Sequence, residues 1–355
     1  MPRRGQIVPT PDAAPRATPA AFIRAILAAY RGQGRDPAPA LARAQIDPAG
    51  LAGPGAGVTA AQLEAMAGRA MRELDDEALG WFSRRLPWGS YGLLARGSLT
   101  APDIHTALRR WFRHHALLTD DVSLALEAEG TEARVHLREN QPLGGDADMR
   151  EFCHVTLLRN AIGFSSWLAD SRIALTEAWF PYPAPDHAGA YDLLFGCPTR
   201  FGAVDAGVAF DARYLALPVR RDEAAMREML RNALPLIVLR YKRDRLLLRR
   251  AQALLATRPE LLANAEALAG ALNLSVRSLH RQLAREGTSL QTLKDEARKA
   301  EAIRLLDRSN RPVKQIAAQT GFANERSFAR AFRGWTGVSP AAWRLGERAD
   351  KSNEY

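Results

Sequence analysis

The strongest constraint on what this chain can fold into is a pattern that its last third contains twice. The first copy lies within Leu268–Leu283 and the second within Ile316–Phe332, offset by 48 residues and by 49 after one insertion. Each copy has a short apolar segment, a turn, and then apolar residues at positions i and i+4 of a second helix, which gives that helix one buried and one free face. The sequence therefore predicts two helix-turn-helix units.

Local signals mark where these helices begin and end. Ser275 and Asn324 precede the second helix of each copy and are predicted to cap it. Gly321 can adopt the positive φ angle needed where the preceding helix stops. Ser339-Pro340 predicts a short closing helix, because proline is favoured at the first helical position. Residues 290–306 are predicted to form a linker helix of roughly 25 Å, which can hold two recognition helices about one DNA turn apart.

The free face of each second helix carries the candidate DNA-binding residues. An arginine near the start of a helix that enters the major groove suits bidentate contact with guanine, and arginines further along suit phosphate. Two recognition helices on one chain can read two successive major-groove segments of double-stranded DNA. The candidates are Arg277, His280, Arg281 and Arg285 in the first copy, and Glu325, Arg326, Ala329, Arg330 and Arg333 in the second.

The distribution of charge agrees with a polyanionic partner. Residues 265–346 contain 14 Lys and Arg against 7 Asp and Glu, whereas residues 21–239 contain 23 basic and 26 acidic side chains. Neutralising phosphates releases counterions and drives binding to nucleic acid, and we expect Arg249 and Arg250 to contact phosphate in this way. Two alternatives remain: a helical bundle whose arginines only keep it soluble, and a nucleic-acid binder without sequence preference, which a specificity ratio at fixed salt would reveal.

The same residues resemble a known family, the AraC/XylS-type transcriptional regulators. The resemblance spans about residues 262–345 and departs from the family pattern mildly at Leu283, Lys299 and Ser327. It implies a sequence-specific transcription factor, an activator that contacts RNA polymerase, with no cofactor. It is densest in Gly321-Phe322, Phe328-Ala-Arg330-Ala-Phe332-Arg333-Gly-Trp-Thr-Gly337-Val338-Ser339-Pro340 and Arg344, whose phenylalanines are predicted to form a small aromatic core.

The first two-thirds of the chain mixes helical and strand patterns. A helix is predicted from about Pro19, another after the capping box of Thr59 and Gln62, and a third beginning near Asp103. Alternating apolar residues in 122–137 predict a β-hairpin, which is followed by a helix near 150–169, a strand near 172–180 and short strands in 201–210. From Arg221 onward only helices are expected, including a long one through 234–255. The fold class is an α+β front domain followed by an all-α domain.

This front part resembles the arabinose-binding-type sensor domain of some AraC-type regulators. The matching segments are Gly92-Leu, Gly97-Ser-Leu99, Pro102 and Ala107-Leu108, and then Phe195-Gly-Cys-Pro-Thr-Arg-Phe201-Gly-Ala. The resemblance implies a small-molecule effector and a possible homodimer without naming the ligand. From the residues alone, Glu177 and Trp179 on one strand, with Trp88 and Tyr91, are candidates to line an effector pocket. The alternatives are a sheet-edge carboxylate facing water and ordinary aromatic core.

These interpretations divide the chain into a disordered lead-in (1–20), an effector-sensing and dimerisation domain (21–220), a basic helical connector (221–256), the double helix-turn-helix domain (257–346) and a tail (347–355). An enzyme is not expected, because the sequence lacks a P-loop, a G-x-S-x-G and an H-E-x-x-H motif. No metal site is expected either, since the histidines and the two cysteines lack ligand spacing. The longest apolar stretch, 234–239, is too short to span a bilayer, and the cysteine usage suggests the cytoplasm.

Overall fold

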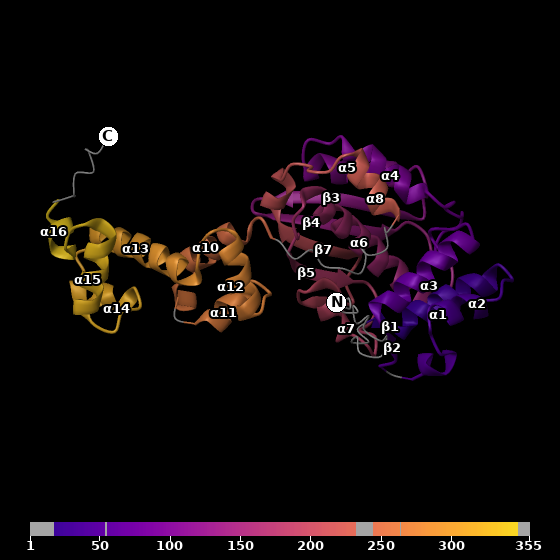
Figure 1. Cartoon of the computed structure of the whole chain (residues 1–355), viewed down its shortest axis with the longest axis horizontal. Coiled ribbons are helices and arrows are strands. Elements are labelled where there is room, and N and C mark those ends of the chain that lie inside the picture. Colours follow the sequence, from indigo (N-terminus) through magenta and orange to yellow (C-terminus); the bar gives the residue numbers. More distant parts are fainter. Residues whose placement is uncertain (1–17, 54, 232–243, 263, 347–355) are drawn as a thin grey trace, which may run out of the picture. The chain divides into compact units, whose positions relative to one another are not determined.

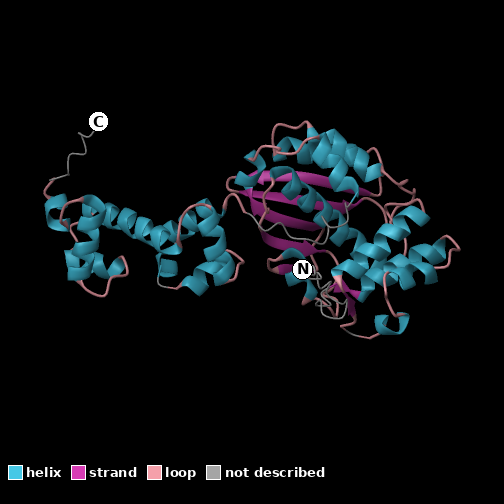
Figure 2. Ribbon diagram, in the orientation of Figure 1, coloured by secondary structure: helices cyan, strands magenta, loops and turns pink. Residues whose placement is uncertain are grey.

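The computed structural model describes residues 18–53, 55–231, 244–262 and 264–346. The chain divides into two compact units, residues 1–244 and residues 245–355. Figures 1 and 2 show strands only in the first unit, while the second is built from helices. The predicted fold class, an α+β part followed by an all-helical part with two helix-turn-helix units, is confirmed.

A five-stranded sheet forms the centre of the first unit. Its strand order is β3-β4-β7-β5-β6, and every neighbouring pair is antiparallel except β5 and β6. The predicted hairpin is the pair β3–β4, joined by a turn in which Gly130 has a φ of +58°. The strand bounds are Val122–Glu129 (β3), Glu132–Glu139 (β4), Leu175–Phe180 (β5), Thr199–Phe201 (β6) and Ala206–Asp211 (β7).

Helix α6 (Ala147–Ala169) is the central helix of this unit. It packs against β4 and β7 of the sheet and also against α1 (Ala20–Gly32) and α5 (Ile104–His115). Because it is covered from several directions, it buries residues around its whole circumference, Glu151 and His154 among them. The other helices of the unit are α2 (Ala38–Arg43), α3 (Ala60–Glu73), α4 (Ser90–Leu99), α7 (Ala190–Phe195) and α8 (Glu223–Arg231), with 3-10 turns at Pro48–Leu51 and Ala212–Ala216.

Several local predictions for this unit are confirmed and two are corrected. Thr59 and Gln62 form the predicted capping box at the start of α3, and Asp103 accepts a hydrogen bond from the Thr106 N–H at the start of α5. The predicted lead-in extends too far: Thr18–Pro19 forms strand β1, paired with β2 (Gly57–Val58), while residues 1–17 lie outside the described part. The strand predicted near 172 begins only at Leu175.

The second unit is arranged along one long helix, α13 (Leu290–Arg308). The long helix predicted through 234–255 is corrected, because residues 244–246 are not helical and α10 begins at Leu247; residues 232–243 lie outside the described part. The remaining helices are α10 (Leu247–Thr257), a 3-10 turn at Pro259–Leu262, α11 (Ala265–Ala271), α12 (Val276–Arg285), α14 (Val313–Gln319), α15 (Glu325–Thr336) and α16 (Pro340–Arg344).

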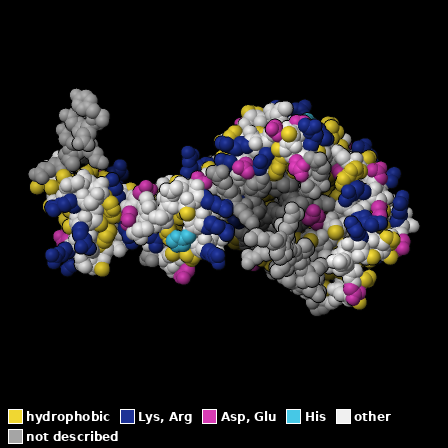
Figure 3. Space-filling view, viewed as in Figure 1, with side chains coloured by type: hydrophobic (Ala, Val, Ile, Leu, Met, Phe, Trp, Pro, Cys, Tyr) yellow, Lys and Arg dark blue, Asp and Glu magenta, His cyan; other side chains and the backbone are white. Residues whose placement is uncertain are grey.

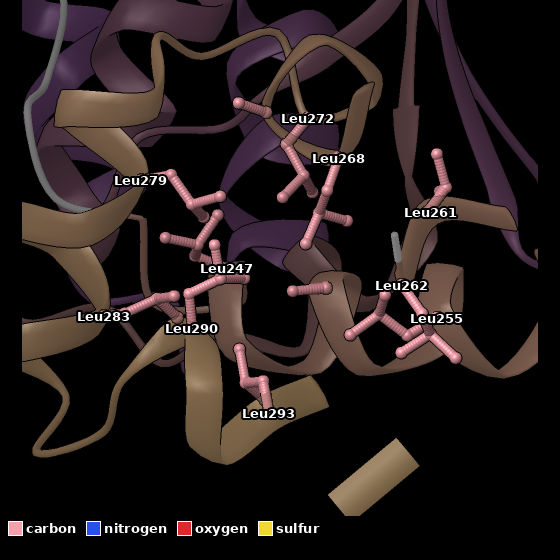
Figure 4. Packing of buried hydrophobic residues seen from close by; sticks show 12 residues of the cluster. Leu247, Leu255, Leu261, Leu262, Leu268, Leu272, Leu279, Leu283, Leu290 and Leu293 are labelled. Atoms are coloured by element: carbon pink, nitrogen blue, oxygen red, sulfur yellow. The ribbon is translucent and has the colours of Figure 1, made fainter. Parts of the chain in front are cut away.

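Two separate hydrophobic cores hold this unit together, and both use α13. The first, which we call the leucine core, joins α10, α11 and α12 to the N-terminal half of α13; Figure 4 shows leucines from these helices pointing toward one another, including Leu268, Leu279 and Leu293. The second, the aromatic core, joins α14, α15 and α16 to its C-terminal half, and it is the core predicted from the phenylalanines. Its buried members are Ala302, Leu305, Leu306, Ile316, Ala317, Phe328 and Phe332.

Candidate nucleic-acid interface and sensor cavity

Helices α11 and α12 form the first helix-turn-helix unit. The turn between them places Asn273 at a φ of +53°, and the Ser275 Oγ accepts a hydrogen bond from the Ser278 N–H at 3.2 Å, so Ser275 caps α12 as predicted. Leu279 and Leu283 of α12 are completely buried in the leucine core. Burial of this one stripe leaves the opposite face of α12 open.

Helices α14 and α15 form the second unit with the same construction. Gly321 has a φ of +78° in the turn, and the Asn324 Oδ1 accepts a hydrogen bond from the Ser327 N–H at 2.8 Å, both as predicted. Phe328 and Phe332 are buried, with ring centroids 5.7 Å apart. The closing helix α16 begins with the predicted cap, since the Ser339 Oγ accepts from the Ala342 N–H.

The predicted contact residues of both second helices lie on their exposed faces, with one exception: Ala329 is half-buried. Within the described part of the chain, the other eight side chains form no hydrogen bond or ion pair with the protein. They are therefore available to an external partner. Figure 3 shows lysine and arginine side chains over the helical part of the chain that contains both helix-turn-helix units. The eight are Arg277, His280, Arg281, Arg285, Glu325, Arg326, Arg330 and Arg333.

The linker helix carries both units on one side. In the view of Figure 1, the pairs α11–α12 and α14–α15 lie on the same side of α13. Its 19 residues span about 28 Å, slightly more than the predicted length. Two side chains of α13 further fix the second helix-turn-helix unit to this helix. The Lys299 Nζ donates to the carbonyl oxygen of Trp335 at 2.9 Å, and the Arg298 guanidinium lies 5.4 Å from the Phe322 ring centroid.

The Lys299 contact explains one departure from the family pattern. An apolar residue is common at this position, and the structure shows that the lysine stem reaches the C-terminal end of α15. A cation there interacts favourably with the terminal carbonyl groups of a helix.

The expectation that Arg250 contacts phosphate is corrected, because this residue is only 9% exposed and cannot offer its charge to phosphate, whereas Arg249 is exposed.

The compact unit of residues 1–244 contains a cavity of about 260 Å³ beside α4, lined by two of the four predicted effector residues, Trp88 and Tyr91. The other two lie elsewhere: the Glu177 carboxylate is 3.1 Å from the Arg200 Nε, and the Trp179 Nε1 donates to the Asp205 Oδ1 at 2.8 Å. The structure thus separates these candidates into two places. The rest of the lining is Met71, Glu77, Gly89, Gly92, Ala95, Arg96, Trp111, Asn160, Phe164, Met229 and Leu230.

Glu77 is the residue of this cavity that sequence reasoning missed. Its two carboxylate oxygens accept hydrogen bonds from the backbone N–H groups of Gly89 at 2.9 Å and Tyr91 at 2.7 Å. Burial raises the pKa of this carboxyl above its ordinary value, more than these two bonds lower it. The available signal was the acidic run Asp75-Asp76-Glu77 just before a tryptophan- and glycine-containing loop, but three neighbouring acids are more often a solvated turn.

His115 lies beneath this cavity and gives the unit a specific pH dependence. Its ring stacks on Trp111 at a centroid distance of 5.4 Å, it is 1% exposed, and its Nε2 has no hydrogen-bond partner in the described part of the chain. Burial lowers the pKa of His115 from 6.5 to about 4. Between these values the unfolded chain binds a proton that the folded chain does not, so stability falls as the pH drops from 6.5 toward 4.

We expect His115→Phe to remove this acid sensitivity. The lowered pKa corresponds to about 3 kcal/mol of folding free energy lost on acidification, and phenylalanine keeps the ring stacking without the titrating group. Urea unfolding at pH 7 and pH 4 measures it, and the wild type should lose about 3 kcal/mol more than the variant over this interval. Equal losses would show that His115 gains its proton in the folded state as easily as in the unfolded one.

The described residues contain no helix long and apolar enough to cross a membrane. The same residues contain no group of three or more histidine, cysteine or acidic side chains arranged to hold a metal ion. Cys153 and Cys197 are both buried free thiols.

Comparison with protein families gives two matches. Residues 34–219 match the model described as the arabinose-binding domain of AraC transcription regulator, and residues 268–346 match a helix-turn-helix domain model. The first match alone covers more than half of the chain. The first range includes the cavity lining except Met229 and Leu230, and the second begins within α11 and includes the rest of both helix-turn-helix units.

Individual relatives are transcription regulators rather than enzymes. The chain is 27% identical over 270 residues to an ornithine utilization regulator of Pseudomonas aeruginosa, covering 76% of this chain and 79% of that protein. It is 31% identical over 157 residues to the regulator VirS of Mycobacterium tuberculosis, covering 44% and 45% of the two chains. Among solved structures, the transcriptional regulator CdpR of Pseudomonas aeruginosa matches at 20% identity, over 92% of this chain and 98% of that one, with a TM-score of 0.32.

Proposed function

Since the chain belongs to the AraC family of transcription regulators and is a DNA-binding transcription factor, we propose that it is an effector-responsive activator that reads two successive major-groove segments with α12 and α15. The observation that carries this proposal is that the eight polar side chains on these two helices are exposed and have no partner among the described residues. Arginines at the start of each helix, Arg277 and Arg326, are in position for base edges or the nearest phosphates.

The effector part of the proposal depends on the front unit. Its match to an arabinose-binding domain model and the cavity beside α4 both support a small-molecule ligand. An effector shifts such a protein only through different affinities for two states, and we propose that these states differ in dimer contacts or in the freedom of the DNA-binding unit. The regulator would then contact RNA polymerase. The relative named for ornithine utilization raises a nitrogen-containing metabolite as one candidate effector.

We also propose the boundaries of the parts. Beginning at β1 rather than at residue 21, the residues up to 220 would sense the effector and dimerise. Residues 221–256 would connect, with α8 in this range contributing Met229 and Leu230 to the cavity, and 257–346 would bind DNA, followed by 347–355 as a tail. A regulator of chromosomal genes works where the DNA lies, so we place it in the cytoplasm. No cofactor is part of this mechanism.

Selection of bound sites from random double-stranded DNA by the full-length protein tests the DNA-reading part. We expect two enriched sequence blocks whose centres lie about one helical turn, roughly 10 base pairs, apart. One block alone would refute simultaneous reading by α12 and α15. Equal affinity for selected and random DNA at fixed salt would favour the binder without sequence preference.

A further inference from the structure

The cavity beside α4 combines an apolar wall with one buried acid. Its apolar lining comes from four separate segments, represented by Met71, Trp111, Phe164 and Leu230. Its volume, about 260 Å³, lies just below the roughly 300–1,000 Å³ of small-molecule sites, which favours a compact ligand. Convergence of distant segments on an apolar hollow with few polar groups is typical of a ligand site.

The acid in this cavity, Glu77, has no cationic partner. Its two hydrogen bonds come from backbone N–H groups at the N-terminal end of α4, and no lysine or arginine of the described residues pairs with it. Asp75 and Asp76 beside it add repulsion. The arginine of the lining, Arg96, is instead directed to Glu223, 3.6 Å away, with about half of its side chain exposed. A buried carboxylate without a counterion is costly, and a bound cation would reduce that cost.

The aromatic side chains around Glu77 suit the same kind of ligand. Trp88 directly precedes Gly89, and Tyr91 itself donates to Glu77 through its backbone N–H. The Tyr91 and Trp111 rings are stacked with centroids 6.0 Å apart. Ring faces attract cations, and the attraction is strongest for tryptophan. Trp88 already shows this behaviour, because the Arg72 guanidinium lies 5.3 Å from its ring centroid. Asn160 adds a neutral hydrogen-bonding group.

We propose that this cavity binds a primary amine carried on a small apolar body, with the ammonium group paired to Glu77 and the body held against Trp88, Trp111 and Leu230. This deepens the proposed function and rests on it, since the amine would be the effector of the regulator. The ligand would also touch α8 through Met229 and Leu230, the final turns of the described helix. Leu230 lies close to α4, 3.6 Å from where a Cβ on Gly92 would be.

The test is isothermal titration of the full-length protein with three amines, 2-phenylethylamine, tryptamine and hexylamine, each compared with the alcohol of the same skeleton. We expect at least one amine to bind and its alcohol to bind at least tenfold more weakly. Glu77→Gln should lower the affinity for that amine at least tenfold and leave that for the alcohol nearly unchanged. The matched control Glu129→Gln, at the exposed end of β3, should bind the amine as the wild type does.

Glu77→Gln keeps only one of the two oxygens that accept from the backbone, so its melting temperature must be measured. If it is unfolded, Trp88→Ala decides instead, because Trp88 is 48% exposed and its removal leaves the core intact. It should weaken amine binding severalfold. Absence of binding by all three amines, equal affinity for amine and alcohol, or full affinity in the folded variants would overturn the assignment.

The same preparations separate this inference from the proposed function. Wild-type protein that selects a two-block operator but binds no amine contradicts only the amine site. Protein that binds the amine but shows no preference among DNA sequences contradicts the regulatory role. An amine that binds and also changes operator affinity supports both.

Discussion

Arg281→Ala is expected to weaken binding to the selected operator by about 1–3 kcal/mol and to relax the preference at particular bases. Arg281 follows Arg277 by one turn on the same face of α12, and it is exposed and without a partner in the described structure. Its guanidinium is therefore free to enter the same groove and make a bidentate contact with guanine. The loss should be concentrated in one sequence block, the one that the first unit reads. Titration of operators with single base changes in each block measures both effects.

The matched control is Arg304→Ala. Arg304 is also exposed, but it lies on α13 and is engaged by Glu301 at 2.6 Å. We expect it to change operator affinity little. If Arg281→Ala lowered the affinities for operator and random DNA by the same factor, Arg281 would be a phosphate contact and the role assigned to it would be wrong.

Phe332→Ala is expected to destabilise the second helix-turn-helix unit by about 3–5 kcal/mol. The Phe332 ring is completely buried in the aromatic core, where it contacts Phe328 and Trp343, and its loss leaves a cavity that the backbone cannot close. Because the leucine core contains different residues, the first unit should stay folded. Operator binding should then depend on one sequence block only.

Urea unfolding and operator binding together check this expectation. Leu279→Ala, the equivalent deletion in the leucine core, should destabilise by about 2–5 kcal/mol and abolish reading of the other block. If either variant lost both blocks together, the two cores would form one cooperative unit and the separation described here would be wrong.

The compact unit of residues 245–355 could be predicted closely because its signals are local. Caps at Ser275 and Asn324, the positive φ of Gly321 and the i, i+4 apolar spacing each act within a few residues and all agree with one another. The error came upstream, where residues 234–255 look like a continuous amphipathic stretch. No local breaker indicated that residues 244–246 would leave the helix, and Asp244 is held by the distant Tyr214 hydroxyl.

The structure of the compact unit of residues 1–244 was harder to predict, for physical reasons. Helix α6 is buried on every side and so lacks the one-sided periodicity that marks an amphipathic helix, and α4 contains Gly92 and Gly97, whose helix propensity is low. The cavity is assembled from segments more than a hundred residues apart. Tyr91 and Trp88 were predicted from composition, but the partnership of Glu77 with them depends on tertiary packing that no local pattern contains.

The leucine core includes the N-terminal half of α13 and the aromatic core includes its C-terminal half, and this has a consequence for how target sites are chosen. A stiff connector gives the second recognition helix a high effective concentration at one distance and almost none at others. About five added base pairs would turn one block to the opposite face of the duplex. The second helix-turn-helix unit could then not reach its block while the first is bound to the other. The protein therefore selects target sites by the spacing of the two blocks as well as by their sequences. Promoters that carry both blocks on opposite faces of the duplex should be bound weakly.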